Sequence, residues 1–287
     1  MALRSFSRWT GCVMYYRVCS LVALLAGALG SSVNAADVRS SSQPVSSDWI
    51  ITIGGDVRAV PLYMGSNAWR AVPSPYFDMR RVGSKEGFHN PRDGVGVALF
   101  DNGVVAIGPV GSLIWRRPQS SSSALNGLGD VGFTGLIGGF TDFWAVPWLR
   151  SRVEVMEGVG GATGTQTNLF MDAVIPLSPA LTWSGGPRAR YVTGGLESTY
   201  FSITQAQSVA SGLPVYNAGS TWQAVGAGTQ LKYRFNPTWA TYAFIEYDKL
   251  VGVTASSPIV TGPGGSSNQW TLSIGLIYSF AATRLPF

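Results

Sequence analysis

The feature that most constrains the fold is an alternation of apolar and polar side chains with a period of two. It is clearest over residues 270–280, where one face carries Trp270, Leu272, Ile274, Leu276, Tyr278 and Phe280. The opposite face is small or polar apart from Ile277. A period of two places successive side chains on opposite faces of a strand. About eleven residues is also the length of a tilted transmembrane strand. The segment therefore fits a half-buried strand of a soluble sandwich or a strand of a membrane barrel.

Aromatic residues stand at the ends of several such faces, which favours the membrane. Trp239 and Tyr247 share a face eight residues apart, about 20 Å along the axis of a barrel whose strands tilt by about 40°. Amphipathic rings prefer the two membrane–water interfaces. The predicted girdle residues are Trp183, Tyr191, Trp239, Tyr247, Trp270, Tyr278 and Phe280.

The first 35 residues read as a cleaved secretory signal peptide. Arg4, Arg8 and Arg17 precede an apolar stretch over residues 18–29, which is short for a transmembrane helix, and residues 33–35 form a small-x-small cleavage site. Residues 36–47 form a Ser-rich, flexible lead-in. Both cysteines, Cys12 and Cys19, fall within the leader. We therefore expect a mature chain without disulfides or thiol chemistry.

The charge content is low for a soluble enzyme. Only 12% of residues are charged, while 46% are hydrophobic and 12% aromatic, whereas globular proteins carry about 25% charged residues. Without the three leader arginines, 17 basic residues stand against 15 acidic ones. No basic run predicts binding to nucleic acid.

Twelve segments can be read as strands, and most of their charges lie on one face only. Because open sheets cannot face lipid, this pattern predicts a closed antiparallel transmembrane β-barrel over residues 48–280. Ten strands is the alternative, obtained by dropping residues 199–204 and one weak early segment, either 72–81 or 88–100. The predicted lumen-lining residues are Arg58, Arg150, Arg152, Glu154, Arg188, Arg190, Lys232, Arg234, Glu246 and Asp248. They allow either an open, weakly anion-selective lumen or a plugged one whose charges pair with each other.

Catalytic and metal-binding motifs are not recognisable. His89 is the single histidine of the chain, and no spacing links it to a nucleophile. The carboxylates Glu154, Glu246 and Asp248 lie beside basic residues, so we interpret them as members of lumen ion pairs. We expect neither an enzyme nor a cofactor.

Several blocks together resemble the MipA/OmpV family. Residues 200–203 (Tyr-Phe-Ser-Ile) precede Gln207, Ser-Gly-Leu at 211–213 and Tyr216, and Ser-Pro-Ile-Val stands at 257–260. Other matches are Pro61, Tyr63, Gly65, Ser66, Tyr242, Tyr247, Leu250, Gly275 and the block 278–280. The family usually has Gly-Val where this chain has Ser202 and Ile203, and it usually ends at the aromatic-x-Phe strand. Residues 281–287 are therefore read as an appended tail.

The resemblance implies an outer-membrane protein with outer-membrane lipid around it. Some members act as a scaffold that joins a lytic transglycosylase, a murein hydrolase, to a penicillin-binding murein synthase. OmpV-like members are surface or pore proteins linked to adhesion and osmotic response. Both roles come from the resemblance and not from a motif of this chain.

Overall fold

The computed structural model describes residues 49–82 and 87–283. The predicted signal peptide, the lead-in and residues 284–287 lie outside the described residues. Within the described part, no helix is long and apolar enough to cross a membrane.

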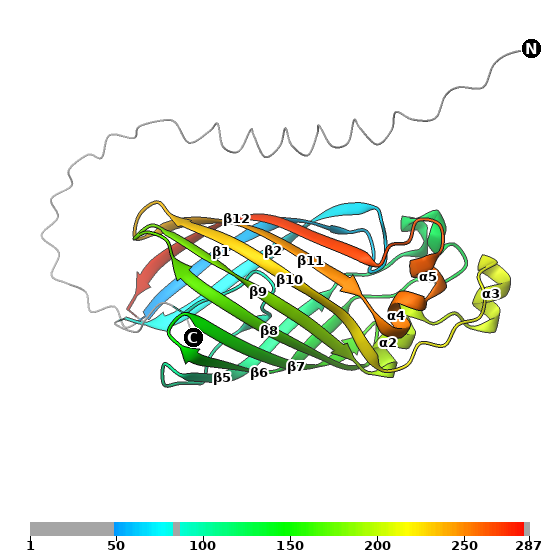
Figure 1. The fold of residues 1–287 in the computed structure, drawn as a ribbon, viewed down its shortest axis with the longest axis horizontal. Coiled ribbons are helices and arrows are strands. Elements are labelled where there is room, and N and C mark those ends of the chain that lie inside the picture. Colours follow the sequence, from blue (N-terminus) through cyan, green and yellow to red (C-terminus); the bar gives the residue numbers. More distant parts are fainter. Residues whose placement is uncertain (1–48, 83–86, 284–287) are drawn as a thin grey trace, which may run out of the picture. The chain divides into compact units, whose positions relative to one another are not determined.

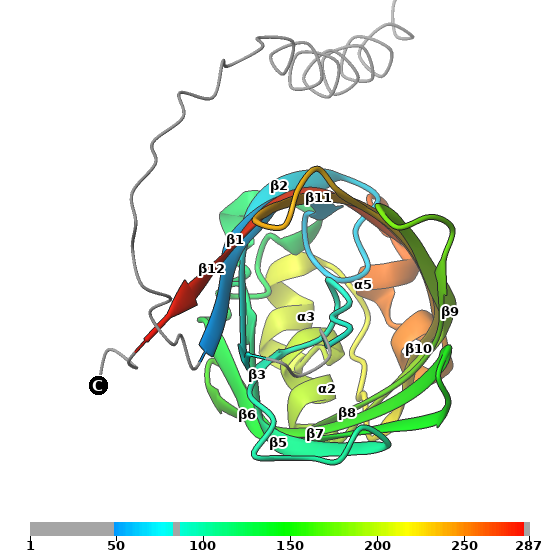
Figure 2. The same ribbon diagram turned by 90° about the vertical axis from the view of Figure 1, so that its left-hand side faces the viewer.

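The described chain forms one antiparallel sheet of twelve strands that curves into a nearly closed barrel (Figures 1 and 2). The predicted fold class, with about twelve strands, is confirmed. Ten strands have 10 to 15 residues, whereas β3 and β4 have two each. The bounds are β1 Trp49–Pro61, β2 Trp69–Arg81, β3 Val95–Gly96, β4 Phe100–Asp101, β5 Val105–Ile114, β6 Thr134–Val146, β7 Leu149–Gly160, β8 Gly164–Pro176, β9 Leu181–Val192, β10 Thr221–Arg234, β11 Trp239–Leu250 and β12 Asn268–Ala282.

Two details differ from the predicted strands. Residues 199–204 were expected to form a strand, but residues 199–201 belong to helix α2, Gly194–Phe201. The last strand continues two residues past Phe280, because Ala281 and Ala282 pair with Ile50 and Trp49 of β1. This ladder between β1 and β12 joins the first and last long strands of the barrel.

The two ends of the barrel are built differently (Figure 1). Short turns connect the strands at one end, here called the turn end, where β1 begins and β12 finishes. The other end, here called the helix end, carries 3-10 helices and α-helices. They are η1 Gln119–Ser121, η2 Ser123–Leu125, α2, α3 Gln205–Ser211, α4 Gly252–Ser256 and α5 Pro258–Thr261.

Strand β12 illustrates why these segments form a barrel wall. Its apolar face points outward, and Trp270, Leu272, Ile274 and Leu276 remain 38–49% exposed. The inward face carries buried Gln269, Thr271 and Ser273, followed by Gly275. A Cβ atom on Gly275 would lie 2.3 Å from the Tyr242 ring, so the aromatic side chain fills the space that glycine leaves. Apolar side chains outside and small or polar ones inside suit a wall between lipid and a narrow lumen.

Loops at the helix end pack into an apolar cap. Leu196, Phe201 and Val260 lie in one buried cluster, and Leu125 and Ile203 lie in another. Polar contacts attach the cap to the barrel and to itself. The guanidinium of Arg117 donates to the Tyr200 carbonyl at 2.6 Å, and the Tyr200 hydroxyl lies 3.0 Å from the Thr134 hydroxyl of β6.

Glu197 is a buried carboxyl within this cap. It accepts hydrogen bonds from the Gln223 amide at 2.8 Å and from the Thr254 hydroxyl. Burial raises the pKa of the Glu197 carboxyl, and the two hydrogen bonds oppose that rise. Protonation of Glu197 is therefore favoured by the folded cap.

Candidate functional site

The lumen is crossed by residues 87–94, the segment that leads from β2 into β3. Figure 2 shows the chain before β3 inside the ring of strands. Asn90 and Asp93 in this segment are only 1% and 8% exposed. A backbone that lies inside a barrel must find polar partners on the inner wall, because its own groups cannot pair within a regular element. We call residues 87–94 the plug.

One side of the plug is attached to β7 and β8. The Asp93 carboxylate accepts a hydrogen bond from the Arg150 guanidinium at 2.9 Å and another from the Asn90 amide at 3.0 Å. The Asn90 side chain donates to Asp172 at 3.3 Å, and the Gly94 amide donates to Glu154 at 2.9 Å. The Asn90–Asp93 bond lies within the plug, whereas each of the other three contacts joins the plug to a strand far away in the sequence.

The other side of the plug is attached to β11. The Arg92 guanidinium lies 2.8 Å from Glu246 and 3.6 Å from Asp248. His89 packs edge-on against Tyr76 of β2, with ring centroids 4.7 Å apart. Its Nδ1 atom lies 3.9 Å from the Asp93 carboxylate. His89 therefore belongs to the plug.

The strand charges continue the network around the wall. Arg150 and Arg152 both contact Asp142 of β6, at 2.8 and 3.0 Å, and Arg152 also contacts Glu154 at 2.7 Å. On β9, Arg188 pairs with Asp172, and its Nε atom lies 3.8 Å from Glu246. The predicted lumen residues that lie in this network are Arg150, Arg152, Glu154, Arg188, Arg190, Glu246 and Asp248.

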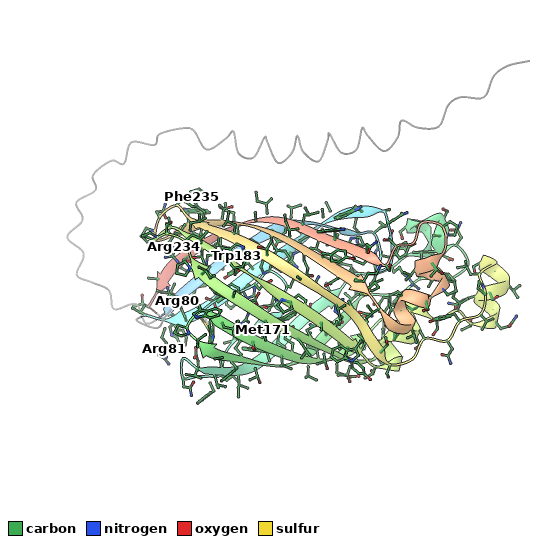
Figure 3. All side chains as sticks on the ribbon, viewed as in Figure 1. Arg80, Arg81, Met171, Trp183, Arg234 and Phe235 are labelled. Carbon is green, nitrogen blue, oxygen red and sulfur yellow. The ribbon has the colours of Figure 1, made fainter. Side chains whose placement is uncertain are left out.

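The remaining predicted lumen residues lie elsewhere. Arg58 is part of a separate group, in which its guanidinium donates twice to Asp56, at 2.8 and 2.9 Å. The Tyr242 hydroxyl donates to the same carboxylate at 2.8 Å. Lys232 and Arg234 lie near the turn end of β10, the first half-buried and the second exposed (Figure 3). The structure thus divides the predicted set between a plug network, an Asp56 group and the turn-end opening.

The predicted girdle residues fall near both ends of the strands. Trp239 packs against Tyr278 and Tyr247 packs against Trp270, each with ring centroids 4.8 Å apart. Register puts the first pair at the turn end of β11 and β12 and the second at the helix end. Phe280 stacks beside Tyr278, Tyr191 contacts Trp222, and the indole of Trp183 donates to Thr229 at 2.8 Å.

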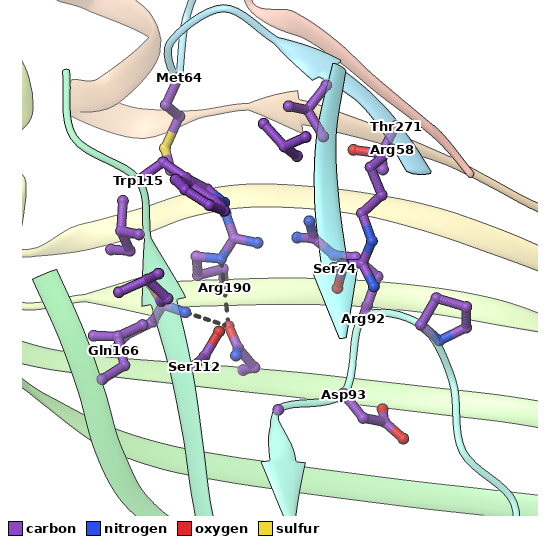
Figure 4. A pocket seen from close by; sticks show the side chains of 18 of the residues that line it. Arg58, Met64, Ser74, Arg92, Asp93, Ser112, Trp115, Gln166, Arg190 and Thr271 are labelled. Atoms are coloured by element: carbon purple, nitrogen blue, oxygen red, sulfur yellow. Dashed lines mark hydrogen bonds between the residues drawn. The ribbon is translucent and has the colours of Figure 1, made fainter. Parts of the chain in front are cut away.

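A chamber of about 740 Å³ lies between the plug and the helix end (Figure 4). Its lining includes Arg92 and Asp93 of the plug and Tyr63 and Tyr200 of the cap. Arginine is in excess over carboxylate in the lining, which contains Arg58, Arg70, Arg92, Arg116, Arg117 and Arg190 but only Asp93, Glu154 and Asp248 among the described residues. Arg190 is held by Asn168 at 3.3 Å, and Asn168 also accepts from Gln166. Arg58, Arg92 and Arg190 have carboxylate partners. Among the described residues, the positive charge available for an anion therefore comes from Arg70, Arg116 and Arg117.

Reasoning from the sequence missed the plug and two carboxylates of the network around it. Arg92 and Asp93 lie in an irregular segment, and Asp142 and Asp172 lie on strands that were identified without assigning these two residues to the lumen. The signal that could have found Asp172 is the alternation of β8, in which Asn168, Phe170 and Asp172 share one face. Among the described residues, no group of three or more His, Cys, Asp or Glu side chains is arranged to hold a metal.

Comparison with known families decides what kind of barrel this is. The family described as MltA-interacting protein MipA matches residues 53–280. The chain belongs to this family. No curated protein matches the chain significantly in sequence.

Solved structures of outer-membrane channels are similar at low sequence identity. The NanC porin is 11% identical, with 82% of this chain and 100% of that chain covered and a TM-score of 0.39. The COG4313 outer membrane channel from Pseudomonas putida F1 is 11% identical, with 86% and 100% covered and a TM-score of 0.38. The CymD monoaromatic hydrocarbon channel is 10% identical, with 83% and 89% covered and a TM-score of 0.36.

Membership of the MipA family and the barrel architecture make this an outer-membrane protein. Barrels of this membrane have short periplasmic turns and longer extracellular loops. The turn end of this MipA-family barrel therefore faces the periplasm, and the helix end with its apolar cap faces outward.

Proposed function

We propose that this MipA-family protein is a non-enzymatic, non-conducting scaffold of the outer membrane that binds a murein enzyme at its periplasmic end. The observation that carries the proposal is the plug. Its Arg92 and Asp93 side chains are paired across the lumen with Glu246 and Arg150, so the barrel interior is used for internal attachment and not for transport. The family description, as an MltA-interacting protein, supports a partner from the murein machinery.

The periplasmic end carries features suited to a partner surface. Arg80, Arg81 and Arg234 gather there with the exposed Phe235 (Figure 3), and the Trp148 side chain at the tip of the β6–β7 turn is 51% exposed. Arginine and aromatic residues are enriched in protein interfaces. A partner with an acidic face would complement this end.

The test is capture of purified murein enzymes by the full barrel in detergent. Immobilised protein is expected to retain a lytic transglycosylase or a penicillin-binding murein synthase. The double variant Arg81→Glu/Arg234→Glu should reduce retention by about tenfold, because like charges across an interface repel. The matched control is Arg116→Glu, which changes an exposed arginine at the extracellular end. Retention of neither enzyme by the folded wild-type barrel contradicts the scaffold.

A small-solute pore is the second candidate, favoured by the arginine excess of the chamber. In this case Arg188, Arg190, Lys232 and Arg234 line a weakly anion-selective path that opens when the plug moves. Ion flow through wild-type protein in planar bilayers supports the pore and contradicts the closed scaffold. Absence of conductance, or a preference for cations, rejects it.

A further inference from the structure

The barrel wall has a seam between β2 and β5 that no β-ladder closes in the described residues. Within the part of the chain that the structure describes, strand β2 pairs only with β1, and β3 covers β5 only at Gly111 and Val110. Beyond them, residues 112–114 of β5 have β6 as their strand partner. The facing part of β2, residues 69–75, is the half nearer the extracellular end. The wall is therefore open here to the chamber behind it.

Two prolines explain why β2 ends the ladder on this side. Pro73 and Pro75 pair in register with Val57 and Gly55 of β1 without an interruption. Proline has no N–H group, so a continuous ladder with β1 requires that both missing donors lie on the opposite edge of β2. That edge faces the seam and lacks two donors that a further strand would need. The seam is thus encoded in the sequence of β2.

The chamber reaches the outer wall through this seam. Its lining includes Leu113 of β5 and Ile137 of β6, which point outward and are 48% and 65% exposed. It also includes Pro73 and Pro75 of the opposite rim. An irregular or unpaired backbone at membrane depth is tolerated where it lines a hydrated cavity. An apolar rim in contact with lipid therefore leads directly into a cavity with a polar interior.

Arg70 stands just inside the rim and supplies a cation without a described partner. It lies on the inward face of β2, lines the chamber and has a buried Nε atom without a hydrogen bond. By contrast, Arg58 is paired with Asp56, and both Arg92 and Arg190 lie within 4 Å of Asp248. Arg70 as a whole is half-buried, and a buried Nε donor without an acceptor is costly unless an anion or water pairs with it.

We propose that the chamber is a binding site for an anionic amphiphile of the membrane, which enters sideways between β2 and β5. The headgroup, a phosphate or carboxylate, pairs with Arg70, and the alkyl chain lies along Val72, Leu113 and Ile137 at the seam. A volume of about 740 Å³ is within the range of about 300–1,000 Å³ typical of small-molecule sites. The proposal does not depend on the scaffold role, because the chamber and the periplasmic end lie on opposite sides of the plug. A barrel of this kind can bind an amphiphile, a periplasmic partner or both.

The experiment uses the full barrel in phosphatidylcholine nanodiscs with a photoreactive hexadecyl phosphate. Crosslinks mapped by mass spectrometry are expected at residues 70–75 and 112–115. Arg70→Gln should weaken labelling there by about tenfold, because hydrogen bonds to charged groups contribute strongly to affinity. Ser112→Trp places a bulky side chain in the chamber beside the seam and should abolish labelling at these residues. Arg81→Gln is the matched control, since it removes an arginine from the other end of the same strand.

Competition distinguishes a membrane ligand from a dissolved anion. Unlabelled hexadecyl phosphate should compete, whereas inorganic phosphate at equal concentration should not. Equal competition by inorganic phosphate overturns sideways entry, because the site then takes free anions. Equal labelling of wild type and folded Arg70→Gln, or crosslinks confined to wall positions away from the seam, overturns the site itself. Folding of each variant is checked by the heat-dependent electrophoretic shift of an intact barrel.

Discussion

Removal of the Asp93 carboxylate is expected to release the plug without unfolding the barrel. Asp93 joins Arg150 at 2.9 Å and the Asn90 amide at 3.0 Å, and neither contact contributes to a strand ladder. Breaking a buried ion pair costs about 3–5 kcal/mol. Arg150 keeps Asp142 at 2.8 Å, so we expect a cost near the lower end of this range. A cost of about 3 kcal/mol raises the ratio of released to attached plug on the order of 100-fold.

The assay is single-channel recording in planar bilayers. Wild-type protein should remain closed, and Asp93→Ala should conduct intermittently with a preference for anions. Asp101→Ala is the control, because Asp101 caps an exposed turn by accepting from the Gly103 amide at 2.8 Å. The reasoning is refuted if folded Asp93→Ala stays as closed as wild type. It is also refuted if the substitution unfolds the barrel, since the plug would then be a structural part of the wall.

Two further predictions concern the cap and the wall. The raised pKa of Glu197 means that its contribution to stability is present below the unfolded value near 4.5 and is lost as pH rises through the folded pKa. Hydrogen exchange in α2 should therefore be slower at pH 4.5 than at pH 7.5 after correction for intrinsic rates. Glu197→Gln should remove this difference between the two pH values. The same difference in the variant as in the wild type would show that Glu197 is not the group responsible. Gly275→Ala should destabilise the barrel by about 1–3 kcal/mol through overlap with the Tyr242 ring. The loss, measured by urea unfolding in micelles, should largely disappear in a Tyr242→Ala background, and no rescue there would rule out this clash.

The wall of the barrel was largely predictable because each strand carries its own signal. Alternation in β12 sorts Leu272 and Ile274 outward and Thr271 and Ser273 inward, and this depends only on neighbouring residues. The turn before β5 also carries a local signal. Asn102 accepts from the Val104 and Val105 amides, and Gly103 adopts a positive φ of 82°, as a tight turn requires.

The plug was not predictable, because its conformation depends on distant partners. Residues 88–100 were interpreted as a weak strand, yet only Val95 and Gly96 at one place and Phe100 at another pair with β5. Arg92 lies inside the lumen because its guanidinium forms ion pairs with Glu246 and Asp248 of β11. Helix α2 is a related case. Its Tyr200 and Phe201 suggest a strand locally, but burial in the cap decides in favour of a helix.

The charges of the lumen are separated along the axis, and this determines what each part can do. Around the plug, the paired side chains are Arg92, Arg150, Arg152, Arg188 and Arg190 with Asp93, Asp142, Glu154, Asp172, Glu246 and Asp248. Five cations against six carboxylates leave this layer almost neutral. The plug is therefore held by ion pairs within the protein and does not require a bound ion. The chamber beyond it keeps the excess of arginine and the unpartnered Arg70. An anion that enters the chamber, through the seam or from the extracellular end, is therefore attracted by the chamber arginines. Its path toward the periplasm is then blocked by the nearly neutral plug layer. That order favours retention of a ligand over its passage to the periplasm.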